Sequence, residues 1–529
     1  MHGLAGALGV LGLVAAAAVV AGVARRLGWS APLLAVCAGL IGSVIPGMPM
    51  VRIEPDIVLS LILPPLLFSA ALDSSFLNFR RNLRPIGLLS VGLVLFTALT
   101  LGWIMYAVVG SDLSLAAAIA LGAIIAPPDA VAATAIGRRI GLPRKLVVIL
   151  AGESLVNDAT ALTAYKVAVA AAVGSGFSFV SATGVFVVAA AGGVVVGLAG
   201  AYVVNWVICR LRDSVLENTL MLLAPFVVFA AAEEIHASGV LAVVVAGLLI
   251  GHKLPRAATY ASRLEADAVW RMIDFLLESV VFLLIGLQLR GVLERLQEWS
   301  VGQLIGWALL ALAVTIVTRL LWVFPATYLP FTLFRRVRER NARPPRRGVV
   351  IIGWAGMRGV VSIAAAYALP PEFPARDLVT YLTFCVVIGT LVLQGFTLPT
   401  LIRRLGVVAE QERRSDDLAE AGAQQRAISA ALGRLEELLD GDGEVPEEIV
   451  TRLRDRAEVR SLAAWERLGG ESAAGPETPT AAYRRLRREM LQAERDVFVR
   501  LRDEGRIDDE VLRRVQLELD LEEAMMARE

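Results

Sequence analysis

The amino-acid sequence is dominated by long apolar runs separated by short polar or charged stretches. A helix that crosses a bilayer needs about 20 consecutive, predominantly apolar residues. Runs of this kind occur thirteen times, at residues 3–23, 30–46, 55–73, 85–109, 112–136, 145–173, 178–208, 217–235, 237–252, 267–290, 301–329, 348–370 and 377–402. The pattern predicts an all-α polytopic membrane protein with about 13 transmembrane helices.

The pattern changes near residue 405, where apolar positions begin to recur every three to four residues among many charges. This spacing predicts amphipathic helices near 418–440, 446–468 and 480–525. We therefore expect a transmembrane domain at 1–402 and a small α-helical tail at 405–529. The tail carries no nucleotide or calcium-binding motif, so regulation or dimer contact is its expected role, and a partly disordered appendage is the alternative.

Composition supports this division of the chain. Apolar residues make up 56% of the sequence and charged residues only 19%, below the quarter typical of soluble domains. The net charge of +1 hides an excess of basic residues in the membrane part and of acidic residues in the tail. The three cysteines lie inside apolar runs and the three histidines are scattered, so neither a disulfide framework nor a bound metal cofactor is expected.

Basic residues in the loops predict the orientation in the membrane. With thirteen spans, loops on one side carry 21 Lys and Arg residues and loops on the other side carry four. Cytoplasmic loops are the basic ones. The N-terminus is therefore predicted to lie outside the cell and the C-terminus in the cytoplasm. The protein is expected to be a multi-pass protein of the plasma membrane, in contact with membrane lipid and without a nucleic-acid partner.

Most polar residues at membrane depth fall in three short segments. Pro128 and Asp129 lie in the fifth run, Gly152 to Asp158 in the sixth, and Gly356 to Gly359 in the twelfth. Intramembrane charges are costly and are functional candidates by default. Residues four apart share a helix face, so Ser154 and Asp158 point one way and Glu153 and Asn157 lie on a neighbouring stripe.

Two of the runs carry residues that interrupt helices. Pro127 and Pro128 remove backbone donors from the fifth run, and glycines surround Arg358 in the twelfth. Broken helices at the bilayer midplane are how secondary transporters present carbonyls and helix ends to ions. The two runs are seven apart in order, which predicts inverted repeats that contain two broken crossing helices.

These segments, together with Leu63-Pro64-Pro65-Leu66-Leu67-Phe68, resemble the NhaP-type bacterial sodium/proton antiporters, which are related to the animal sodium/proton exchangers. The resemblance implies a homodimer in which an ion-carrying bundle, about 85–173 and 301–402, moves against a dimerisation part, about 1–73 and 178–290.

The resemblance also assigns roles to site residues. It implies that Asp158 binds the cation or the proton, that Ser154 and Asp129 help to ligate Na⁺, and that Asn157 stands where electrogenic relatives have a second aspartate. Pro128, where relatives often have Thr, still offers its carbonyl to the ion. An ion pair between Glu153 and Arg358 is expected to hold the bundle together.

A second departure from the family pattern, besides Pro128, is Ser69, where relatives commonly have an acidic residue, so an auxiliary carboxylate is expected to be missing. Three further charged residues are expected to lie outside the ion site. Arg319 is expected to be either an interfacial group or one that pairs within the bundle, and Asp73 and Asp274 are expected to be solvated near span ends.

One carboxylate that holds either a proton or a cation, but not both, is sufficient for exchange. With Asn157 neutral, the simplest stoichiometry is one cation per proton, which is electroneutral. The expected function is Na⁺/H⁺ exchange for pH and sodium homeostasis, with K⁺ or Li⁺ as possible substrates. A K⁺-preferring antiporter or a cation channel on the same scaffold is the alternative. No hydrolase motif is present, so the protein is expected not to be an enzyme.

Overall fold

The computed structural model describes residues 2–27, 31–45, 57–174, 179–294, 296, 299–333, 335, 339, 343–407, 409–441, 446–469, 479–504, 506 and 509–528. Its internal contacts divide the chain into two units, Met1–Val408 and Ala409–Glu529. Within the described residues all regular elements are helical.

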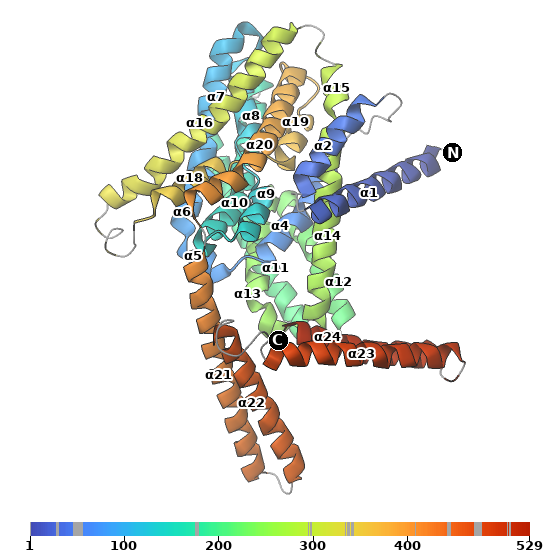
Figure 1. Cartoon of the computed structure of the whole chain (residues 1–529). Coiled ribbons are helices and arrows are strands. Elements are labelled where there is room, and N and C mark those ends of the chain that lie inside the picture. The colour runs from blue at the N-terminus through green and yellow to red at the C-terminus, as the bar shows by residue number, and fades with distance from the viewer. Residues whose placement is uncertain are drawn as a thin grey trace. The chain divides into compact units, whose positions relative to one another are not determined.

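The first unit is an assembly of helices joined by short connections (Figure 1). Its α-helices are α1 (His2–Leu27), α2 (Ala31–Val44), α4 (Leu63–Leu72), α5 (Phe76–Arg81), α6 (Leu83–Gly87), α7 (Val94–Val109), α8 (Leu115–Ile125), α9 (Ala130–Ile140), α10 (Arg144–Ala172), α11 (Phe179–Leu211), α12 (Ser214–Glu234), α13 (Gly239–Ala257), α14 (Tyr260–Leu287), α15 (Leu289–Leu293), α16 (Val301–Leu333), α18 (Arg346–Trp354), α19 (Val360–Tyr367) and α20 (Arg376–Leu405). Two π-helical turns, η1 (Val58–Ile62) and η2 (Leu88–Leu93), lead into α4 and α7.

Helices occupy every run that the sequence predicts to cross the membrane. In the described part of the chain, eight helices are long and apolar enough to cross a bilayer, and four shorter apolar helices accompany them. The number thirteen stays a prediction, as do the predicted boundaries at residues 30, 46, 55 and 178, which lie outside the described residues.

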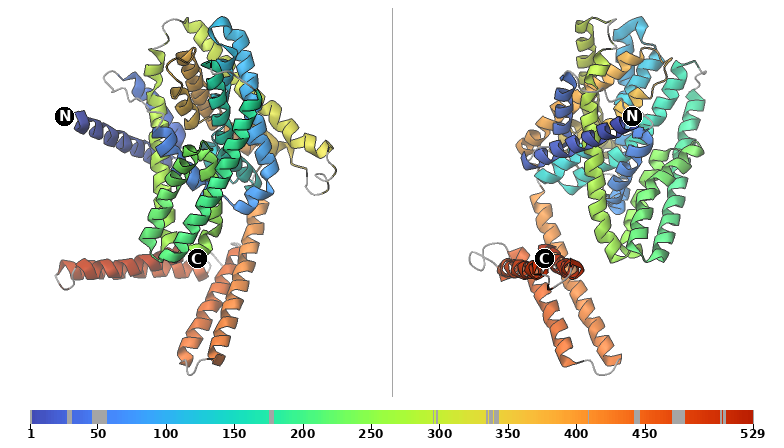
Figure 2. Two further views of the ribbon diagram at one scale, coloured as in Figure 1. Left: turned by 180° about the vertical axis from the view of Figure 1, so that it is seen from behind. Right: turned by 90° about the vertical axis from the view of Figure 1, so that its right-hand side faces the viewer.

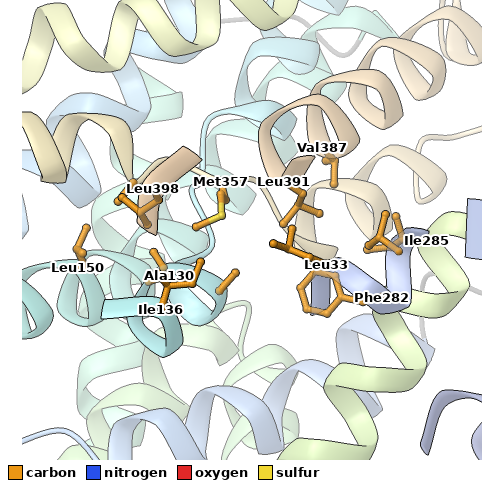
Figure 3. Packing of buried hydrophobic residues seen from close by; sticks show 14 of the residues in the cluster. Leu33, Ala130, Ile136, Leu150, Phe282, Ile285, Met357, Val387, Leu391 and Leu398 are labelled. Atoms are coloured by element: carbon orange, nitrogen blue, oxygen red, sulfur yellow. The ribbon is translucent and has the colours of Figure 1, made fainter. Parts of the chain in front are cut away.

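The helices of this unit pack into two groups, which Figures 1 and 2 show from three sides. In one group α7 packs on α8, α8 on α10, and α16 on α7 and α20. In the other, α11 and α12 pack on α13, α13 on α4, and α14 on α2. Each group has its own buried apolar cluster, and a third cluster lies between them. Figure 3 shows part of this third cluster, where Leu33 and Phe282 lie near Leu391.

Both broken helices that the sequence predicts are present as breaks in the structure. The fifth run forms α8 and α9, separated by residues 126–129, and the twelfth forms α18 and α19, separated by residues 355–359. Pro127 and Pro128 have no backbone N–H, so helical hydrogen bonding cannot continue through them. The inverted-repeat relation itself stays a prediction.

The second unit consists of α21 (Glu410–Gly441), α22 (Glu447–Gly469), α23 (Pro479–Asp503) and α24 (Asp509–Arg528). The single helix predicted at 480–525 is two helices in the structure, α23 and α24, which pack on each other through Leu491, Leu519 and Met526. Arg487 reinforces this pairing, because it donates hydrogen bonds of 2.7 and 2.8 Å to Glu522. These bonds hold the pKa of Glu522 below its usual value.

Candidate ion-binding site

The two breaks meet and bind each other through backbone hydrogen bonding. Pro128 and Arg358 form an isolated antiparallel bridge, and the amide of Asp129 donates to the carbonyl of Met357 at 2.7 Å. Asp129 also caps α9, since its Oδ1 accepts a 2.8 Å hydrogen bond from the amide of Val131. A carboxylate at this position is favoured by the positive end of the helix dipole.

Helix α10 lies against this crossing and holds it with the polar residues of its motif. Asn157 Nδ2 donates a 2.6 Å hydrogen bond to the carbonyl of Pro128, and Ser154 Oγ accepts a 3.2 Å hydrogen bond from the amide of Ala130. Both bonds satisfy backbone groups that the interrupted helix leaves without an internal partner. The polar motif of α10 therefore fixes the position of the break.

A cavity of about 310 Å³ lies beside the crossing. Asp129, Ser154 and Asp158 all line it, together with apolar residues of η1, α4 and α14. Asp158 is 7% exposed, and within the described residues its carboxylate has neither a hydrogen bond nor a basic partner. Asn157 and Pro128, which the sequence places in the same ion site, are absent from this lining and bind each other instead.

The expected ion pair between Glu153 and Arg358 is corrected by the structure. Glu153 pairs with Arg319 of α16 through two hydrogen bonds, of 2.5 and 2.8 Å, and both side chains are essentially inaccessible to solvent, at 1% and 0% exposed. The physical reason is the position of Arg319 beside the carboxylate, while the donors of Arg358 are engaged elsewhere. A bidentate pair of this kind is the strong geometry for arginine and carboxylate.

Arg358 instead covers the carboxyl end of α8. It donates to the carbonyls of Ile125 at 2.9 Å, Ala126 at 3.4 Å and Gly356. The last carbonyls of a helix lack internal donors and form its negative end, so a buried guanidinium there satisfies both needs.

Arg319 acts in the same way at the other break. It donates to the carbonyl of Ile352 at 3.0 and 3.2 Å and to that of Ala355 at 3.2 Å, at the carboxyl end of α18. In each broken helix, therefore, one buried arginine donates hydrogen bonds to the carbonyls at the carboxyl end of the first half.

The glycines of the twelfth run interrupt its helix and also let neighbouring side chains lie close to its backbone. A Cβ atom on Gly359 would overlap the carboxylate of Asp129, and one on Gly356 would overlap the side chain of Arg319. Side chains at these two positions would therefore push the crossing apart.

The lining of the cavity also includes polar residues from α4 and α14. Ser69 Oγ donates a 2.5 Å hydrogen bond to Asp274 Oδ2, and Asp274 lines the cavity with Asp73 and Glu278. Asp274 is therefore not the solvated residue that its place near a span end suggests. Sequence reasoning missed it because α4 and α14 are distant in the chain, and only their packing brings Ser69 and Asp274 together.

Comparison with known proteins identifies the family. The model of the family described as "Sodium/hydrogen exchanger, transmembrane" matches residues 13–404. The chain belongs to the sodium/hydrogen exchanger family. It is 34% identical to an uncharacterized Na(+)/H(+) exchanger of Mycobacterium tuberculosis, over 98% of this chain and 95% of that one. It is 30% identical to the Na(+)/H(+) antiporter ApNhaP of Aphanothece halophytica, over 75% and 74% of the two chains.

The fold of this exchanger has a counterpart among solved structures. It resembles the sodium proton antiporter MjNhaP1 of Methanocaldococcus jannaschii with a TM-score of 0.60 at 20% identity, covering 76% of this chain and 99% of that one. The resemblance of its motifs to NhaP-type antiporters is thus confirmed, and so is the expectation of a secondary transporter and not an enzyme.

Proposed function

We propose that this exchanger transports Na⁺ in one direction and H⁺ in the other across the plasma membrane, and that the two ions compete for Asp158. The observation that carries the proposal is the contrast between two carboxylates of α10. Glu153 is neutralised by Arg319, whereas Asp158 has no basic partner among the described residues. A buried carboxylate without a counter-charge is costly. A proton or a cation removes that cost, and each excludes the other.

Asp129 and Ser154 are proposed to complete the cation site from the same cavity, because carboxylate and hydroxyl oxygens suit a hard monovalent cation. Asn157 and the carbonyl of Pro128 are proposed to act through the backbone that they hold in place, since they bind each other. The pair of Glu153 and Arg319 is proposed to be structural.

The division into two helix groups supports a proposal of alternating access. We propose that the bundle, about 85–173 and 301–402, carries Asp158 past a dimerisation part, about 1–73 and 178–290, in a homodimer. The N-terminus is proposed to lie outside and the tail at 405–529 in the cytoplasm, where it regulates exchange. Asp158 is proposed as the one carboxylate that exchanges its proton for the cation, and Asn157 is neutral, so the proposed stoichiometry is one cation per proton, which is electroneutral.

The test uses purified protein in proteoliposomes with an internal pH-sensitive dye. An outward-directed sodium gradient in the wild type should drive proton uptake, and Asp158→Asn should abolish it. Asp267→Asn is the matched control, because Asp267 is exposed and paired with Arg271 on α14. Retention of exchange by Asp158→Asn at the control rate would contradict the proposal. Replacing Na⁺ by K⁺ or Li⁺ in the same assay ranks the substrates.

A further inference from the structure

The lining of the cavity includes acidic residues of α14 and of the end of α4. The Ser69 hydroxyl of α4 donates a 2.5 Å hydrogen bond to Asp274 Oδ2, which fixes the carboxylate of Asp274 at the cavity lining. α4 and α14 pack directly on each other, so the two side chains are held by the framework of their helix group.

The second oxygen of this carboxylate is unsatisfied. Asp274 Oδ1 is shielded from solvent and accepts no hydrogen bond from any described residue. A buried acceptor without a donor is costly, and the cost is larger for a charged group. Asp274 therefore keeps acceptor capacity on the carboxylate whose other oxygen Ser69 binds.

The cavity has room for a cation that keeps part of its water. Its volume of about 310 Å³ is several times the roughly 30 Å³ that one water molecule occupies in the liquid. The lining that contains Asp274 also contains Asp158, Asp129 and Ser154. Asp274 and Asp158 therefore line the same space.

We propose that Asp274 is a further cation-binding residue of the exchanger, positioned by Ser69, and that it recruits the hydrated cation to Asp158 from the cytoplasmic side. This inference rests on the proposed function. Asp274 lies on α14, in the proposed dimerisation part, whereas Asp158 lies in the proposed moving bundle. Asp274 does not travel with the bundle, so it acts only while the cavity is open toward it.

The cytoplasmic side is assigned from lining residues that lie near predicted cytoplasmic loops. Asp73 and Ser74 at the end of α4, and Arg138 near the end of α9, line the cavity and lie next to loops that are predicted to be cytoplasmic. Loss of the Asp274 charge should therefore weaken sodium capture from the cytoplasm and leave capture from outside unchanged.

The test measures initial exchange rates against sodium concentration in proteoliposomes of known orientation, with sodium added to either face. In Asp274→Asn, we expect the apparent KM for cytoplasmic Na⁺ to rise about fivefold, roughly 1 kcal/mol of lost binding, with Vmax within about twofold of wild type. Ser69→Ala should raise the same KM by about twofold, because the carboxylate stays but loses its positioning bond. Asp274→Glu should lie nearer to wild type than Asp274→Asn.

Asp267→Asn, on the same helix and in an exposed pair with Arg271, is the matched control and should leave both values unchanged. An unchanged cytoplasmic KM in Asp274→Asn, or an equal rise at both faces, would overturn the inference. If Asp274→Asn does not fold, Ser69→Ala carries the same sided test, and an unchanged cytoplasmic KM there overturns it. A wild type that shows no exchange at either face would instead refute the proposed function.

Discussion

The buried pair of Glu153 and Arg319 makes a quantitative prediction about stability. Replacing Arg319 by Met removes a bidentate contact of 2.5 and 2.8 Å between two side chains that are essentially inaccessible to solvent. Removal of one partner from such a pair costs about 3–5 kcal/mol, because the other charge stays buried. The carbonyls of Ile352 and Ala355 lose their donor as well. Arg319→Met should therefore lower the free energy of unfolding by at least about 3 kcal/mol.

A double-mutant cycle separates the pair from the other losses. The free energy of unfolding is measured by tryptophan fluorescence during reversible SDS unfolding in mixed micelles, for Glu153→Gln, Arg319→Met and the double variant. The coupling energy should be about 3 kcal/mol, because the double variant leaves no unpaired charge. A second cycle pairs Glu153→Gln with Arg358→Met and should give at most half of that coupling, since Arg358 donates to carbonyls. Equal or stronger coupling to Arg358 would refute the assignment.

Three further predictions follow from the crossing and the tail. Gly359→Ala should lower exchange at least about tenfold, because its Cβ overlaps the Asp129 carboxylate, whereas Gly302→Ala on α16, which has open space, should not. Truncation after Gly406 should shift the pH response of exchange in proteoliposomes and preserve transport; complete loss in a folded, dimeric truncation would contradict a regulatory tail. Hydrogen bonds from Arg487 lower the pKa of Glu522 in the folded state. The ionised Glu522 therefore stabilises the α23–α24 pair above the ordinary pKa of 4.5, and this stabilisation is lost as pH falls through the lowered pKa of the folded state. Hydrogen exchange of α24 in the full chain, corrected for intrinsic rates, should show this loss below pH 4.5 in the wild type and not in Glu522→Gln.

The sequence was sufficient to predict the features that depend on local chemistry. Pro127 and Pro128 predict the break between α8 and α9 because proline lacks the N–H that a helix interior needs. Helical spacing alone places Ser154 and Asp158 on one face of α10, and both line the cavity.

Features that depend on tertiary packing could not be predicted from the sequence. Glu153 has two buried arginines nearby, and the choice of Arg319 depends on how α16 packs on α18. The local signal in the sequence was an arginine in the middle of an apolar run. Such a residue needs an acidic or carbonyl partner, but its position in the sequence does not identify that partner. Ser69 suggested a missing carboxylate, but the packing of α14 on α4 brings Asp274 to that place.

Competition at Asp158 is tested most directly by the pH dependence of sodium affinity. Protonation and cation binding exclude each other if they use one carboxylate, so a fall in pH should raise the apparent KM for Na⁺, up to about tenfold per pH unit on the acidic side, while Vmax at saturating Na⁺ stays constant. The measurement is the initial exchange rate in proteoliposomes across a series of sodium concentrations and pH values. A KM that does not change with pH, together with a Vmax that falls, would contradict competition and place the proton on a different group.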